Sequence, residues 1–221
     1  MISSRALIGI VLAALLLILS QLTLGSMGQY IFPYYFGSKE WVSISGFCAN
    51  ILVIVLAFIV PTLPAKVGKK ELSAFGGILG AVVFFIAFIL HTDNLYLFIA
   101  LYTIGYLGIG FFNVNCWAMI TDVIDDAEVR EGERSDGTFY SVYSFARKMG
   151  QAASSGLSGA LLGIVGYTEA TAFDPDVLNG IYDISCLVPA AGFLLMALAL
   201  IFVYPLGKKK VDSNIAVLKA K

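Results

Sequence analysis

The chain has 221 residues, of which 59% are hydrophobic and only 13% are charged. Soluble domains carry about 45–50% apolar and about 25% charged residues, so this composition excludes an ordinary soluble domain. The formal net charge of -1 says less than the positions of the charges, because those positions set the orientation of a membrane protein. We therefore predict an all-α integral membrane protein in contact with a lipid bilayer, with no separate soluble domain and no nucleic-acid partner.

Six apolar segments follow one another along the chain, and a transmembrane helix needs about 20 such residues. The predicted spans are residues 6–36, 41–63, 72–90, 95–124, 138–165 and 181–204, followed by a cytoplasmic tail at 208–221. We expect the end of this tail, residues 211–221, to be disordered. The first segment starts like a signal peptide, but it continues to Phe36 without a clear small-residue cleavage site. A retained helix is therefore predicted.

Prolines, glycines and cysteines add local detail to these segments. Pro61 and Pro64 are expected to end the second segment, because proline cannot continue a helix. Gly76 and Gly80 in the third segment have the spacing that lets two membrane helices approach closely. The three cysteines all lie in apolar segments without a CxxC motif, which predicts buried free thiols and no metal site.

Basic residues are concentrated in alternate connections of the chain. The N-terminus and every second loop hold Arg5, Lys66, Lys69, Lys70, Arg130, Arg134, Lys208, Lys209 and Lys210. The other three loops together hold only Lys39. Because positively charged loops stay on the cytoplasmic side, this pattern predicts a multi-pass protein of the cell membrane with both termini in the cytoplasm.

A dense charged stretch follows the fourth apolar segment. Its acidic residues are Asp122, Asp125, Asp126, Glu128, Glu131, Glu133 and Asp136, with Arg130 and Arg134 among them. Three hypotheses fit this stretch. It forms an ion-pair latch that breaks in another conformation, a Mg²⁺-diphosphate site like that of some membrane prenyl-transfer enzymes, or a solvated loop with local salt bridges.

The fifth segment carries its polar side chains along one side. At about 100° per residue, one narrow stripe holds Tyr140, Ser144, Lys148, Gln151, Ser155 and Ser158, with Arg147 at its edge. Lipid contact along this stripe would be costly, so we predict that it faces a water-filled cavity or the bundle interior. Lys148 and Arg147 then either serve a solute pathway or reach the cytoplasmic interface for structural reasons alone.

Several of these residues belong to a wider pattern. The stretch from Trp117 to Asp125 is WAMITDVID, and Arg134 follows as part of GxRxxG. YSV begins at Tyr140, RKxGQ begins at Arg147, and GxxGY ends at Tyr167. Taken together, these motifs resemble the glycoside-pentoside-hexuronide:cation symporters, the melibiose permease-like group of the major facilitator superfamily.

The resemblance covers all six segments and matches the second half of such a transporter, helices seven to twelve. It implies uptake of a sugar or glycoside coupled to Na⁺ or H⁺ by alternating access, without any other cofactor. The predicted substrate or pathway residues are Lys148, Gln151, Ser144, Tyr140, Asn113 and Trp117. The predicted cytoplasmic gate consists of Asp122, Asp125, Arg134 and Arg147.

The first six helices of the family have no counterpart here, and the family's cation-site carboxylates lie on those helices. The resemblance therefore implies a partner, a missing N-terminal six-helix half supplied in cis or in trans. The alternative is a non-transporting membrane subunit or regulator. We predict no enzyme, because a Mg²⁺-dependent transferase would want a second acidic cluster facing the first, and only one is present.

Overall fold

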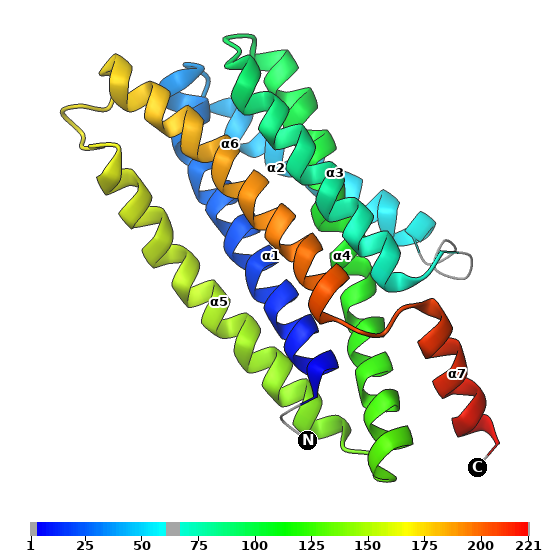
Figure 1. Cartoon of the computed structure of the whole chain (residues 1–221). Coiled ribbons are helices and arrows are strands. Elements are labelled where there is room, and N and C mark those ends of the chain that lie inside the picture. Colours follow the sequence, from blue (N-terminus) through cyan, green and yellow to red (C-terminus); the bar gives the residue numbers. More distant parts are fainter. Residues whose placement is uncertain (1–3, 61–66, 221) are drawn as a thin grey trace.

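The computed structural model describes residues 4–60 and 67–220. These residues form helices and no strand, which confirms the all-α prediction. The helices are α1 (Arg5–Tyr30) continued by η1 (Ile31–Tyr35), α2 (Glu40–Ile59), α3 (Lys69–Leu90), α4 (Leu95–Glu131), α5 (Asp136–Ile164), α6 (Pro175–Leu198) continued by η3 (Ala199–Val203), and α7 (Lys208–Lys219). Figure 1 shows α1 to α6 running side by side, with α7 beside one end of the bundle.

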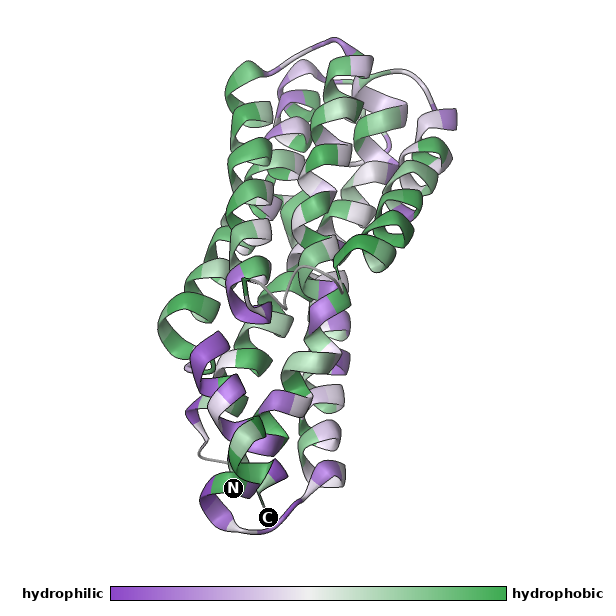
Figure 2. Ribbon diagram, turned by 90° about the vertical axis from the view of Figure 1, so that its right-hand side faces the viewer, coloured by the Kyte–Doolittle hydropathy of each residue, from purple (hydrophilic) through white to green (hydrophobic). Residues whose placement is uncertain are grey.

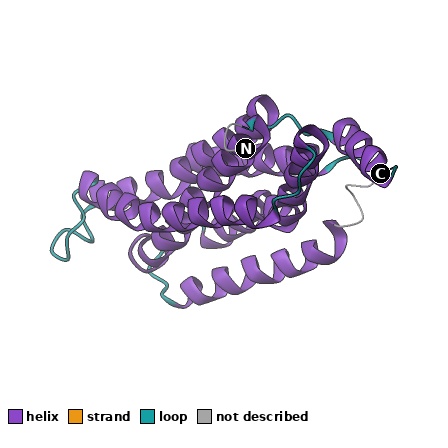
Figure 3. Cartoon of the chain, turned by 90° about the horizontal axis from the view of Figure 1, so that it is seen from below, coloured by secondary structure: helices purple, strands orange, loops and turns teal. Residues whose placement is uncertain are grey.

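The centre of the bundle is formed by four helices. α6 packs against both α1 and α3, and α3 packs against α4. α5 lies on α1 at one edge, and α2 lies on α4 at another. Figure 3 shows α2 set apart from the other helices, in keeping with the small buried share of its apolar residues.

Close contact between α3 and α4 depends on glycine. A Cβ atom on Gly108 would lie 2.6 Å from the carbonyl oxygen of Gly76, and one on Gly80 would lie 3.0 Å from that of Gly105. A side chain at either position would push the two helices apart. The predicted role of Gly76 and Gly80 in close helix approach is confirmed, with Gly105 and Gly108 as their partners.

The start of α1 and the whole of α7 lie at the same end of the bundle. Both termini lie there in Figure 1, and Figure 2 shows hydrophilic residues gathered at the same end. Five helices described by the structure are long and apolar enough to cross a membrane: α1 with η1, α2, α3, α4, and α6 with η3. α5 has 29 residues, which is also long enough to span, but it carries the polar stripe.

Several predicted boundaries were wrong. α4 extends to Glu131 instead of ending at residue 124, so most of the charged stretch is helical. α6 starts at Pro175, six residues before the predicted start. The tail expected to be disordered forms α7. The predicted end of the second segment at 63 and its prolines Pro61 and Pro64 lie outside the described residues, as does Lys66.

Candidate functional site

A polar cavity of about 250 Å³ lies between α1, α4 and α5. α1 contributes Gln21, α4 contributes Asn113, Cys116 and Trp117, and α5 contributes Arg147 and Gln151, with apolar residues of α1 completing the wall. Three amides, a guanidinium and an indole thus converge from three helices. Such a set of donors and acceptors in a membrane bundle is suited to a hydroxyl-rich solute.

The two asparagines of α4 have different surroundings. Asn113 Nδ2 donates to Gln21 Oε1 over 3.4 Å, which is a long hydrogen bond across the cavity between α4 and α1. Asn115 is buried and donates to the Phe111 carbonyl over 2.9 Å and to Ser73 Oγ over 3.5 Å. Asn113 therefore lines the cavity, whereas Asn115 faces α3.

Arg147 is held in the cavity by aromatic rings. Its guanidinium carbon lies 5.9 Å from the centre of the Trp117 ring and 5.7 Å from that of the Tyr143 ring, both within cation–π range. It also donates to the Tyr143 hydroxyl over 3.3 Å. Tyr143 is fully buried, so its ring and hydroxyl form a fixed support for the guanidinium.

The predicted pathway residues do not all reach this cavity. Asn113, Trp117 and Gln151 line it. Tyr140 lies next to it, with its ring centre 6.2 Å from that of Trp117 and its hydroxyl 3.2 Å from Thr121 Oγ1. Ser144 and Lys148 are exposed on α5 outside the cavity lining. Gln21 and Cys116 also line the cavity, although neither was named as a pathway residue. Gln21 is one of the polar side chains in the second half of the first apolar segment, and these predict that this part borders a cavity instead of lipid on all sides.

Arg134 gathers three carboxylates at the junction of α4 and α5. Its guanidinium lies 2.9 Å from Asp136, 2.8 Å from Asp125 and 2.9 Å from Glu128. These carboxylates, Asp136 foremost, raise the pKa of Arg134 further above its ordinary value, so it carries its charge at any physiological pH. The structure thus brings together two of the predicted gate residues, Asp125 and Arg134.

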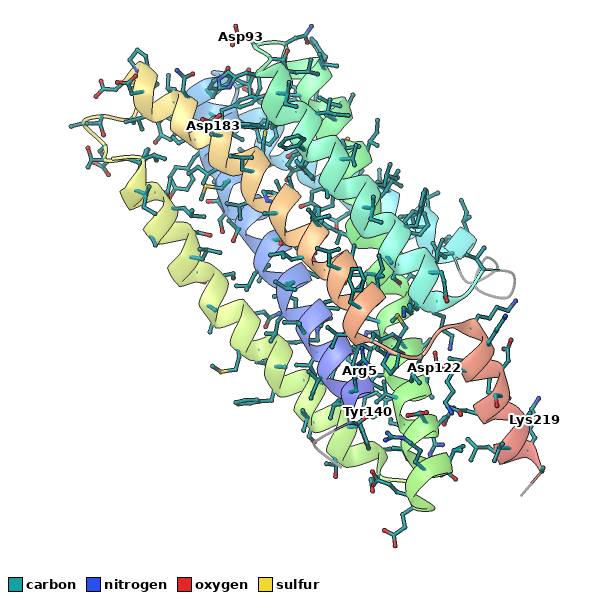
Figure 4. All side chains as sticks on the ribbon, viewed as in Figure 1. Arg5, Asp93, Asp122, Tyr140, Asp183 and Lys219 are labelled. Carbon is teal, nitrogen blue, oxygen red and sulfur yellow. The ribbon has the colours of Figure 1, made fainter. Side chains whose placement is uncertain are left out.

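The other two predicted gate residues lie apart from that cluster. Asp122 is buried and its Oδ1 lies 2.6 Å from Lys69 Nζ, which joins α4 to the first turn of α3. Arg147 lies in the cavity instead. Figure 4 shows Asp122 and Tyr140 toward the end of the bundle that carries the termini, and Asp93 and Asp183 at the opposite end.

A third charged group ties α7 to α4. Asp126 is buried and accepts from Arg130 Nε over 2.9 Å and from Asn214 Nδ2 over 3.1 Å. Lys210 Nζ lies 4.0 Å from the same carboxylate, and Arg130 also donates to Ser4 Oγ over 3.1 Å. The chain's first described residue, the end of α4 and α7 therefore share one network.

The acidic residues in the described ranges are not arranged as a metal site. No group of three histidine, cysteine, aspartate or glutamate side chains there is placed to hold a metal ion. Cys116 and Cys186 are buried free thiols, as predicted, whereas Cys48 is only half-buried.

Comparison with known proteins places this arrangement in a family. A family model described as MFS/sugar transport protein matches residues 1–208. An uncharacterized symporter of Bacillus subtilis is 31% identical over 93% of this chain and 44% of its own length. A glucuronide carrier protein homolog of Escherichia coli is 28% identical over 94% of this chain and 45% of its own. An isoprimeverose transporter of Lactiplantibacillus pentosus is 32% identical over 68% of this chain and 32% of its own.

The chain spans less than half the length of these relatives. The relatives are named as transporters and not as enzymes, which agrees with the prediction that the chain is no enzyme and argues against the membrane transferase. The match over residues 1–208 covers every long helix of the bundle. The chain is a multi-pass membrane protein that belongs to the MFS/sugar transport protein family of the major facilitator superfamily.

Proposed function

We propose that the chain transports a sugar or glycoside by symport with Na⁺ or H⁺, as the C-terminal six-helix half of an alternating-access transporter. The observation that carries this proposal is the cavity between α1, α4 and α5, where Gln21, Asn113, Gln151 and Arg147 converge inside an apolar bundle. Polar and ionisable side chains at such a depth mark solute pathways in membrane proteins.

The partner half is part of the proposal. The relatives are more than twice as long as the matched region. In this chain the polar face of α5 is exposed, and Lys148 and Ser144 on that face do not line the cavity. An N-terminal six-helix half, supplied in cis or in trans, would cover that face and close the cavity. Lys148, Ser144 and Tyr140 would then reach the pathway together with the residues that already line it.

The charged end of the bundle supplies the proposed gate. Arg134 holds Asp125, Glu128 and Asp136, and Lys69 holds Asp122, all near the end where both termini lie. Ion pairs of this kind re-form with other partners when two halves of a transporter rock against each other. By the distribution of lysine and arginine, this end faces the cytoplasm and the protein resides in the cell membrane.

Uptake into vesicles tests the proposed function. The chain is reconstituted alone and with candidate N-terminal halves from relatives, and a labelled glycoside is added with and without a gradient of Na⁺ or H⁺. We expect uptake that depends on a cation gradient when a matching half is present. Insertion is checked separately by protease protection. Inserted protein that takes up no glycoside in any combination would contradict transport and favour a non-transporting subunit or regulator.

A further inference from the structure

We propose that the solute bound between α1, α4 and α5 is an anionic sugar, whose acidic group pairs with the guanidinium of Arg147. This inference rests on the proposed function and narrows its substrate class. The family leaves that class open, because glucuronide carries a carboxylate and isoprimeverose carries no charge.

Arg147 is half-buried and lies far from both ends of α5. It is eleven residues beyond Asp136, the first residue of α5, which places it about 16 Å along that helix. A cation at this depth is costly in an apolar environment. Unlike a residue near a helix end, it cannot offset that cost fully by extending to the headgroups. A counter-charge is therefore expected close to it.

The part of the chain that the structure describes supplies no such counter-charge. The contacts of Arg147 are the rings of Trp117 and Tyr143 and the Tyr143 hydroxyl, and no carboxylate lies within ion-pair distance. Lys69, Arg130 and Arg134, by contrast, each pair with an aspartate. The aromatic rings orient the guanidinium without neutralising it, so its charge remains available to a ligand.

The geometry of the cavity fits a sugar acid. A guanidinium offers a planar fork of N–H donors that matches a carboxylate in a bidentate manner. Gln21, Asn113 and Gln151 each offer an amide that can donate to and accept from hydroxyl groups. The 3.4 Å bond between Asn113 and Gln21 is weak enough to open when a hydroxyl replaces it. The cavity has about 250 Å³ on this chain alone, and the proposed N-terminal half would complete it.

One competing arrangement makes a different prediction. The N-terminal half could place a carboxylate on Arg147 when the two halves assemble. The solute would then need no charge, and removal of Arg147 would weaken the binding of acidic and neutral sugars to the same extent. Comparison of two sugars that differ only in charge separates the two arrangements.

Binding is measured by the fluorescence of Trp117, which lines the cavity. The chain has two tryptophans, so Trp41→Phe leaves Trp117 as the only indole of this chain, and any tryptophan of the N-terminal half is replaced likewise. The protein is held in lipid nanodiscs, alone and with the N-terminal half that supports uptake. Methyl glucuronide, methyl glucoside and methyl glucuronamide are titrated in turn. We expect the glucuronide to bind at least about tenfold more tightly than either neutral sugar, as a charge-assisted hydrogen-bond pair predicts.

Arg147→Gln and Lys148→Gln then form a matched pair, because each removes one positive charge from adjacent positions. Arg147→Gln should reduce glucuronide affinity to that of the glucoside and leave glucoside affinity unchanged. Lys148→Gln tests the neighbouring cation: it should keep the preference for the acid, because the acidic group pairs with Arg147, which lines the cavity, whereas Lys148 lies outside that lining in this chain. If the N-terminal half brings Lys148 to the pathway, its loss should weaken the binding of all three sugars alike. Thermal unfolding of both variants checks that they are folded. The titration of the three sugars needs neither variant.

Four results would overturn the proposal. Equal affinity for glucuronide and glucoside would refute the acidic substrate while leaving sugar transport intact. Loss of the preference in Lys148→Gln alone, or an equal loss for both sugars in Arg147→Gln, would refute the pairing with Arg147. Binding of none of the sugars, together with absent uptake, would refute the proposed function itself.

Discussion

At the scale of single residues, the pair of Lys69 and Asp122 connects two helices that no sequence pattern links. Asp122 is only 5% exposed, and Lys69 Nζ lies 2.6 Å from its Oδ1. The lysine side chain is 28% exposed, so water screens part of the attraction. The larger effect is that the lysine satisfies a buried carboxylate.

We predict that Lys69→Met destabilises the chain by about 1–3 kcal/mol, because it leaves the Asp122 carboxylate buried without its donor. For a chain of this size, each kcal/mol corresponds to about 2–4 °C in the unfolding temperature. Circular dichroism in detergent measures the shift. The double variant Lys69→Met with Asp122→Asn should recover part of the loss. A double variant as unstable as the sum of both single variants would show that the two groups are not coupled.

At the residue level, partners close in the chain were easier to group than distant ones. Asp125 and Arg134 are nine residues apart across one helix end, and the gate implied by the family resemblance already contained both. Lys69 and Asp122 are 53 residues apart, so only the packing of α3 on α4 reveals that pair. Helical periodicity placed Arg147 at the edge of the polar stripe, but it could not tell which adjacent helix the edge would meet. α1 and α4 meet that edge, and so Arg147 reaches the cavity while Lys148 stays exposed.

At the scale of whole helices, the ends were harder to predict than the spans. α4 continues past its apolar part to Glu131, because Arg130 pairs with Asp126 one turn earlier and Gly132 ends the helix in the left-handed conformation, with φ of 81°. Hydropathy reports where a helix leaves the bilayer and not where it ends in water. α7 was missed for the same reason, because it contains no apolar run that hydropathy could detect. Its single buried residue, Asn214, donates a hydrogen bond to Asp126 of α4.

The packing of α3 on α4 gives a prediction at this scale. Gly108→Ala should lower the unfolding temperature by roughly 2–12 °C, because its Cβ would lie 2.6 Å from the Gly76 carbonyl oxygen and overpacking costs about 1–3 kcal/mol. Gly156→Ala on α5 is the matched control. A Cβ there meets nothing within 4 Å, so the variant should be neutral or slightly more stable. If both variants had the same effect, helix propensity and not close packing would explain it.

At the scale of the whole molecule, composition was sufficient for the fold class and the motifs were sufficient for the family. Burial of apolar surface in lipid imposes the long helices, and every backbone group within the bilayer is then satisfied inside its own helix. In the proposed transporter, the solute pathway has two walls, and the completed substrate site could not be predicted from one of them. Under that proposal, the exposed side of α5 is where the second wall is expected.

The orientation of the bundle is a prediction for the complete protein in its membrane. Ser213 is exposed on α7, and Glu169 is exposed in the connection between α5 and α6. α7 and the connection between α5 and α6 lie toward opposite ends of the bundle (Figure 1). Ser213 and Glu169 are each replaced by cysteine in a Cys48→Ala background. Cys48 is removed because it is only half-buried, whereas Cys116 and Cys186 are buried and should not react.

Since the end with the lysines and arginines is expected in the cytoplasm, a maleimide that cannot cross membranes should label Glu169→Cys in intact cells. It should leave Ser213→Cys unlabelled until the cells are permeabilised. The reverse pattern would place both termini outside the cell and with them the Arg134 cluster, which would then be no cytoplasmic gate. Labelling of both positions in intact cells would instead mean that the two ends of the bundle do not lie on opposite sides of a sealed membrane.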